Sequence, residues 1–211
     1  MRALVLAALL AGFAPRVARA DCAADADHLR AHLVEVDPAV FRWNTVWTVA
    51  LGTAAVAQFT LAATHTNPFG TFNDDFKEAM YVGGTKSAIG MLSRIVTPLR
   101  VHIPDPNADR CADLIALRAS VKKLASQERQ NFWLTHIGGF AMNAGGGLLL
   151  WYRRSFKVGA TSFLTSLPVG WLIAYTLPRK TWHLYRSESP SWTVTVGAAE
   201  GHGTIGIAGT F

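Results

Sequence analysis

The sequence is poor in charged residues and lacks the motifs of the common enzyme classes. Charged residues make up 16% of its 211 positions, against about 25% in an average soluble protein, whereas hydrophobic residues make up 50%. No run of five or more basic residues accompanies the formal charge of +6, which argues against nucleic-acid binding. There is no C-x-x-C pair, P-loop or nucleophile elbow. We therefore expect a protein that is not an enzyme and has no cofactor or metal.

The first twenty residues have the order of a cleavable export signal. Arg2 precedes an apolar run at 3–14, and Ala18-Arg19-Ala20 is an A-x-A cleavage pattern. Residues 1–20 are therefore predicted to be a signal peptide, and the mature chain is predicted to belong to the cell envelope. The alanine-rich signal and the short loops favour the inner membrane of a bacterium.

Apolar stretches dominate the middle of the chain, at residues 45–64, 79–98, 131–152 and 158–177. The first contains no charged residue, and its twenty positions would span about 30 Å as a helix. The second contains Lys86 and Arg94, which leaves open whether it crosses the membrane or lies flat. The sequence thus predicts an all-α membrane helical bundle of about four transmembrane helices.

The remaining segments flank this predicted bundle. Residues 21–44 are expected to form an extracytoplasmic N-terminal helix that Asp37-Pro38 breaks. The membrane domain, residues 45–178, includes an extracytoplasmic amphipathic helix at 108–130. Its apolar stripe consists of Leu114, Leu117, Val121 and Leu124. The C-terminal tail, residues 179–211, has two alternating, β-branched stretches around a glycine-rich turn and predicts a β-hairpin.

The distribution of basic residues predicts the orientation. The loop at 153–157 is short and uniformly basic, so the positive-inside rule places it in the cytoplasm. Counting back along the predicted spans places both termini and residues 99–130 outside, although the acidic 65–78 loop gives no support. Cys22 and Cys111 then share the oxidising side, which predicts a disulfide between them. The alternative for Cys22 is a lipidated N-terminus.

Four polar residues lie inside the predicted spans: Lys86, Arg94, His136 and Asn143. A charge in hydrocarbon is costly, so these residues suggest a polar intramembrane site, such as an anion or proton pathway. The alternatives are structural. Arg94 would extend to the interface, and Lys86 would reach a carboxylate such as Asp75 or Glu78, or the inner interface. His136 and Asn143, seven residues apart on one helical face, would hydrogen-bond between helices.

The expected function is that of a non-enzymatic integral membrane protein, a scaffold or subunit of a membrane complex. Its expected partners are the lipid bilayer and another membrane protein or a second copy of the chain, but no nucleic acid. The alternative function is a small transporter or channel with a polar intramembrane site. An intramembrane enzyme is disfavoured, because the sequence offers no paired acid and base. His28 and His32 have a metal-ligand spacing, but two histidines on a surface helix are more often simply solvated.

Overall fold

The structure is a computed structural model that describes residues 21–188, 191–199 and 202–210. Its elements are α2 (Cys22–Ala63), α3 (Asp74–Val96), α4 (Arg110–Trp133), the π-helical turn η1 (Leu134–Gly138), α5 (Gly139–Arg153), α6 (Phe156–Tyr175), α7 (Lys180–Glu188), β1 (Ser191–Ala199) and β2 (His202–Thr210). The predicted signal peptide, residues 1–20, lies outside the described residues.

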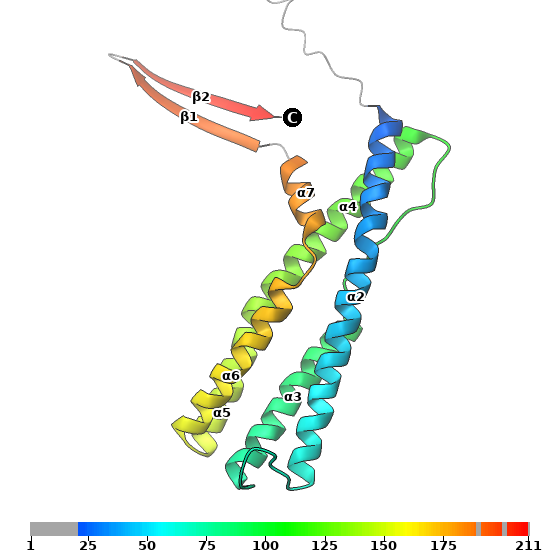
Figure 1. The fold of residues 1–211 in the computed structure, drawn as a ribbon. Helices are drawn as coiled ribbons and strands as arrows, with labels where there is room; N and C mark the ends of the chain where they lie inside the picture. Colours follow the sequence, from blue (N-terminus) through cyan, green and yellow to red (C-terminus); the bar gives the residue numbers. More distant parts are fainter. Residues whose placement is uncertain (1–20, 189–190, 200–201, 211) are drawn as a thin grey trace, which may run out of the picture.

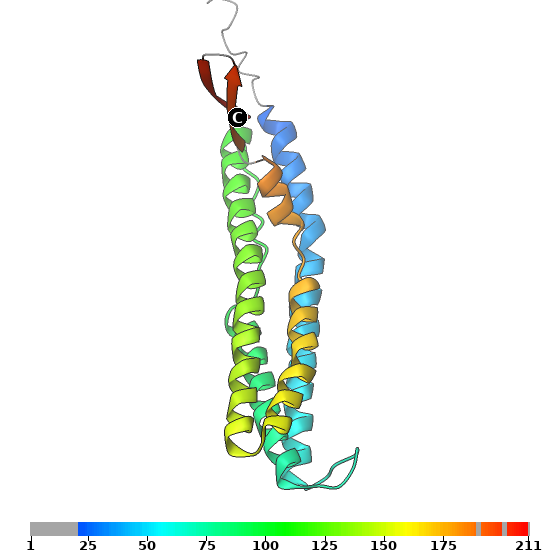
Figure 2. The same cartoon turned by 90° about the vertical axis from the view of Figure 1, so that its left-hand side faces the viewer.

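The helices form a long, narrow bundle (Figure 1). α4 continues through η1 into α5 as one extended helical rod (Figure 2). The α2–α3 loop and the α5–α6 turn lie at one end of the bundle, which we call the loop end. The starts of α2 and α4 lie at the opposite end (Figure 1). Two helical hairpins, α2–α3 and α5–α6, therefore run side by side toward the loop end.

The main hydrophobic core lies away from the loop end, between the first half of α2 and α4. The apolar stripe predicted for the amphipathic helix is confirmed, because Leu114, Leu117, Val121 and Leu124 are each at most 3% exposed. They pack against buried residues of α2, among them Leu29 and Leu33. Full burial of one leucine stabilises the fold by roughly 1.5–3 kcal/mol. This stripe therefore fixes α4 against α2.

The predicted helix break at Asp37-Pro38 is wrong. α2 runs unbroken for 42 residues with Pro38 inside it. A proline in a helix interior costs about 3 kcal/mol, because it removes one backbone hydrogen bond. Val36 and Val40 on either side of Pro38, together with Trp43, are almost fully buried in the core. Their burial offsets the local cost, so α2 continues from the part that packs against α4 into the apolar segment.

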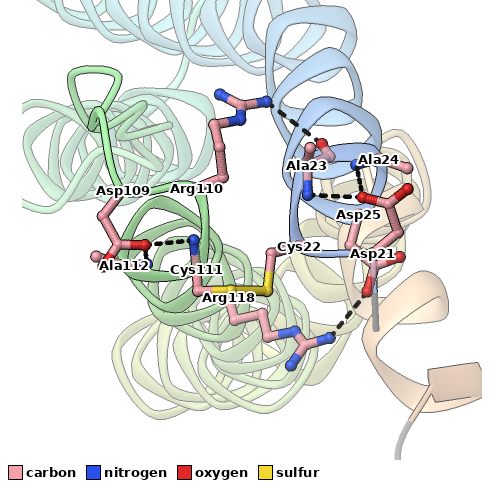
Figure 3. The surroundings of a disulfide bond; sticks show 10 residues. All are labelled: Asp21, Cys22, Ala23, Ala24, Asp25, Asp109, Arg110, Cys111, Ala112 and Arg118. Carbon is pink, nitrogen blue, oxygen red and sulfur yellow. Dashed lines mark hydrogen bonds and ion pairs between the residues drawn. A yellow bond between two sulfur atoms is a disulfide. The ribbon is translucent and has the colours of Figure 1, made fainter. Parts of the chain in front are cut away.

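The predicted disulfide between Cys22 and Cys111 is present (Figure 3). Its Cα atoms are 5.0 Å apart, and it joins the first turn of α2 to the first turn of α4. Asp21 and Asp109 cap these two helices by accepting hydrogen bonds from backbone N–H groups of the first turns (Figure 3). The two helix starts are thus aligned by side-chain caps and by a covalent link.

A buried carboxylate reinforces this junction. Asp113 of α4 is 1% exposed, and its two oxygens accept from Arg30 at 2.7 Å and Arg110 at 3.2 Å. Arg110 also pairs with Asp27 of α2. A buried carboxylate is tolerated only when it is paired and hydrogen-bonded. Asp113 meets that condition through arginines of both helices.

Close helix approach holds each hairpin together. A Cβ on Gly159 of α6 would lie 2.4 Å from the carbonyl oxygen of Gly147 in α5. In the other hairpin, a Cβ on Gly84 of α3 would lie 2.9 Å from the ring of Phe59 in α2. Neither position has room for a side chain. These glycines let the paired helices pack backbone against backbone or against an aromatic ring.

The prediction of about four transmembrane helices is wrong. Among the described residues, two helices are long and apolar enough to cross a membrane, α2 and α6. α3 fails because it contains Lys86, Arg94 and several charges in its first turns, and the regular helix α5 has only 15 residues. A span needs about 20 residues. The helical body therefore provides one such helix in each hairpin.

The two apolar helices are largely uncovered by the rest of the chain. Val49 and Val56 of α2 are 61% and 67% exposed, and Leu164 and Trp171 of α6 are 61% and 54% exposed. Few residues of either apolar window are buried. The core helix of a soluble protein would be mostly buried instead.

Beyond α7, strands β1 and β2 pair antiparallel, with Ser191 opposite Thr210.

Candidate functional site

A cavity of about 590 Å³ lies between the two helical hairpins. Its walls come from α2, α3, the end of α4, η1, α5 and α6. Trp47 and Gln58 of α2 and Thr165 and Ile173 of α6 are among the lining residues. The cavity therefore lies at the level of the two apolar helices. Its size falls within the range of about 300–1,000 Å³ that is typical of small-molecule sites.

The polar lining is rich in hydroxyls and amides. The hydroxyl residues are Ser87, Ser93, Thr97, Thr135, Thr165 and Ser166, and the amide residues are Gln58, Asn131 and Asn143. Lys86 and Arg94 also line the cavity, whereas none of its lining residues is an aspartate or a glutamate. The cavity thus carries two cationic groups without a carboxylate in its wall.

Lys86 reaches across the cavity from α3 to α6. Its Nζ donates to Ser166 Oγ at 2.9 Å, and Ser166 Oγ in turn donates to the carbonyl oxygen of Ser162 at 2.7 Å. Gly146 of α5 makes room for the lysine stem, because a Cβ there would lie 3.1 Å from Lys86 Cδ. The predicted pairing of Lys86 with Asp75 or Glu78 is not found among the ion pairs of the described residues.

Arg94 is held at the other end of the cavity, near the main core. Its two terminal nitrogens donate to Asn131 Oδ1 at 3.2 Å and to Thr135 Oγ1 at 2.9 Å. Its guanidinium lies over the Trp43 ring, 4.4 Å from the centroid. The side chain is 9% exposed, and Nε has no hydrogen-bond partner in the described part of the chain. Arg94 is therefore a buried cation whose described partners are all neutral.

The four predicted site residues do not all meet. Asn143 lines the cavity, and its Nδ2 donates to the carbonyl oxygen of Ser166 at 3.3 Å, next to the Lys86 contact. His136 does not line it. The His136 ring instead packs between Phe132 and Tyr175, with centroid distances of 4.6 and 5.2 Å. The structure therefore brings Lys86, Arg94 and Asn143 to one cavity and places His136 in an aromatic cluster.

Sequence reasoning missed an ionic cluster at the loop end. Glu78 of α3 accepts from Arg153 at 3.1 Å and from Arg154 at 2.8 Å, and Arg154 also approaches Asp74 and Asp75. Hydrogen bonds from Arg153 and Arg154 lower the pKa of Glu78. Asp74, Asp75 and Glu78 are the acidic residues that gave no support to a cytoplasmic location of the 65–78 loop. In the structure they pair with the basic residues at the end of α5.

Sequence reasoning also missed Glu128. This α4 residue is fully buried, and its Oε2 accepts from the backbone N–H of Trp182 at 2.6 Å, in the first turn of α7. Burial raises the pKa of Glu128 to about 7, against the opposing effect of hydrogen bonds from Trp182 and Thr181. Glu128 continues the stripe of Val121 and Leu124 at the next helical position, which is the sequence signal that could have revealed it.

No group of three or more His, Cys, Asp or Glu side chains in the described residues could hold a metal ion. His32, one of the two histidines with metal-ligand spacing, contacts Thr181 Oγ1 at 3.2 Å. Comparisons of the chain with protein-family models, with curated proteins and with solved structures found no match. The function therefore has to be inferred from the cavity and its surroundings.

Proposed function

We propose that this protein is a small integral membrane transporter or channel, and that its solute occupies the cavity between the two helical hairpins. The observation that carries the proposal is the convergence of Lys86, Arg94 and Asn143, from α3 and α5, on one cavity. Polar groups buried at the level of apolar helices are costly, so they are retained where they line a solute site.

Two features support a membrane location. α2 and α6 have the length and apolar composition of spans and expose large aliphatic and aromatic side chains. The part of the bundle beyond the cavity has an ordinary buried core and charged surface pairs, such as that of Arg118 and Asp25 at 3.3 Å. Lipid would cover the first region and water the second.

The proposed orientation follows from charge and from the disulfide. The loop end contains the basic residues 153–157, which favours the cytoplasmic side. The opposite end contains the Cys22–Cys111 disulfide, which favours an oxidising compartment. Together with the export signal predicted at 1–20, this supports the inner membrane of a bacterium, with the termini outside. A scaffold or complex subunit, our first expectation from the sequence, would give no reason for a polar cavity.

The proposal is tested by solute flux through the full chain in phosphatidylcholine proteoliposomes. The panel contains phosphate and acetate as anions, rubidium as a cation and glycerol as a neutral solute. Gly139 and Gly145 of α5 provide a matched pair of variants. A Cβ at either glycine meets nothing within 4 Å, but only Gly139 lines the cavity.

We expect flux of at least one solute class above that of empty liposomes. The Gly139→Phe variant should lose most of this flux because the ring fills the cavity, whereas Gly145→Phe should keep it. Equal flux through both variants would show that the cavity is not the route. Absence of flux for every solute, from protein with the native helix content, would refute transport.

A further inference from the structure

The charge around the cavity is unbalanced. Lys86 and Arg94 line it without a carboxylate in its wall, and neither takes part in an ion pair among the described residues. Burying a cation without a counter-charge costs several kcal/mol. A ligand that carries a negative charge would reduce this cost at the cation that it contacts, whereas a neutral or cationic ligand would keep or increase it.

The two cations differ in what they offer a ligand. Both terminal nitrogens of Arg94 already donate within the fold, and the guanidinium face is stacked on Trp43. Lys86 has a single described partner, the neutral hydroxyl of Ser166. An ammonium group has three donors, so Lys86 retains donors for a ligand. Arg94 therefore fastens α3 to α4 and η1, and Lys86 faces the cavity as the binding group.

The spacing of the cations limits the ligand to one of them. Lys86 and Arg94 lie eight residues apart in α3, which corresponds to about 12 Å along the helix axis. Because Lys86 Nζ is held at Ser166 and the terminal nitrogens of Arg94 are held at Asn131 and Thr135, a compact anion such as acetate or phosphate contacts only one of the two cations. Near Lys86, the amide of Asn143 provides a further donor, since its only described bond is the 3.3 Å contact to the Ser166 carbonyl.

A proton pathway, the other function considered for these residues, lacks its relay groups. His136 lies outside the cavity, and the lining of the cavity contains no carboxyl group. From these observations we infer that the cavity binds a compact oxyanion, a carboxylate or a phosphate group, at Lys86 with the amide of Asn143 as a second donor. This inference rests on the proposed function and specifies its solute class.

The same chemistry has two sources, a free anion in solution and the headgroup of an anionic lipid. The test uses the full chain in nanodiscs, and the readout is the midpoint of thermal unfolding by tryptophan fluorescence. In phosphatidylcholine discs, acetate and inorganic phosphate are titrated at constant ionic strength, with acetamide as the neutral analogue. A second set of discs contains phosphatidylglycerol and no added oxyanion.

The variants are Lys86→Gln, Lys86→Arg and Lys122→Gln, the last being a matched change at an exposed lysine of α4. We expect saturable stabilisation of the wild type by an oxyanion but not by acetamide. Lys86→Gln should weaken this binding by about 10- to 100-fold, because it removes one charged hydrogen bond. Lys86→Arg and Lys122→Gln should retain it. Stabilisation only in the phosphatidylglycerol discs, lost in Lys86→Gln, would identify the lipid headgroup as the source.

Other outcomes overturn the inference. Oxyanion binding that is equal in the wild type and in Lys86→Gln would assign the site elsewhere. Absence of stabilisation by any oxyanion or by the anionic lipid would refute it as well. If glycerol or rubidium still crosses the proteoliposomes in those cases, the proposed transport function stands and only the anion assignment fails. If nothing crosses, the proposed function fails too.

Discussion

Replacement of Glu128 by glutamine should make the protein more stable above pH 7 and remove part of its pH dependence. Glu128 is fully buried between α4 and α7, and its pKa is raised from 4.5 to about 7. In the unfolded chain the carboxyl group is exposed and ionises near 4.5. The folded state therefore binds this proton more tightly than the unfolded state does.

The sign and the size of the effect follow from this difference. Because the pKa is raised on folding, the contribution to stability is fully present below about pH 4.5 and is lost as the pH rises through about 7. One pKa unit corresponds to 1.36 kcal/mol, so a shift of about 2.5 units amounts to about 3 kcal/mol. For a domain of this size that equals roughly 6–12 °C in the unfolding midpoint.

The assay compares thermal unfolding of the wild type and Glu128→Gln between about pH 4.5 and pH 8. The informative quantity is the difference between the two curves, because contributions that both proteins share cancel in it. A neutral amide avoids the cost of a buried charge, and its oxygen still accepts from the Trp182 N–H. The midpoint of Glu128→Gln relative to that of the wild type should therefore rise between about pH 4.5 and 7 and level off above about pH 7.

Glu35→Gln is the matched control. Glu35 also joins α7, through Lys180 at 2.6 Å, but it is exposed, and the hydrogen bond from Lys180 lowers its pKa. Its difference curve should stay nearly flat between pH 5.5 and 8. Parallel curves for the wild type and Glu128→Gln across this range would refute the assignment of a raised pKa to Glu128.

Three further predictions concern the framework. Replacing Cys22 and Cys111 by alanine should lower the free energy of unfolding by about 4–5 kcal/mol, because they are 89 residues apart; reductant should destabilise the wild type equally and leave the variant unchanged. Gly159→Ala should destabilise by about 1–3 kcal/mol through overpacking, whereas Gly145→Ala should be neutral or stabilising by up to about 1 kcal/mol in the same denaturation assay. Glu78→Gln should speed amide exchange at the end of α5, and unchanged exchange would show that its ion pairs contribute nothing there.

The packing of α4 against the first half of α2 was largely predictable from the sequence, because local patterns and tertiary packing agree there. The apolar spacing from Leu114 to Leu124 required a partner face, and α2 provides it. The disulfide was predicted by expecting both cysteines on the same oxidising side, and the structure contains it. By contrast, Pro38 shows a local rule overridden by packing, since the buried residues around it hold the helix together.

The number of spans and the composition of the site were less predictable. Hydropathy depends on residue types and does not show where a regular helix begins or ends. The apolar stretch at 131–152 therefore gave no sign that the chain changes there from α4 through η1 to α5. His136 and Asn143 were placed on one face by assuming a uniform α-helix. His136 lies in η1, where the hydrogen bonds run from i to i+5. This altered repeat turns His136 away from the face that carries Asn143.

Glu128 shows how such a residue can be found from the sequence. The stripe at Leu117, Val121 and Leu124 leads to position 128, so the pattern requires an apolar side chain where the chain has a carboxyl group. A conflict between a reliable helical pattern and the residue type marks a position where another contact compensates for the cost. Here the compensation is the backbone of α7, which follows the apolar helix α6. A protonation change at Glu128 should therefore affect the contact between α4 and α7, the helix that follows the apolar helix α6.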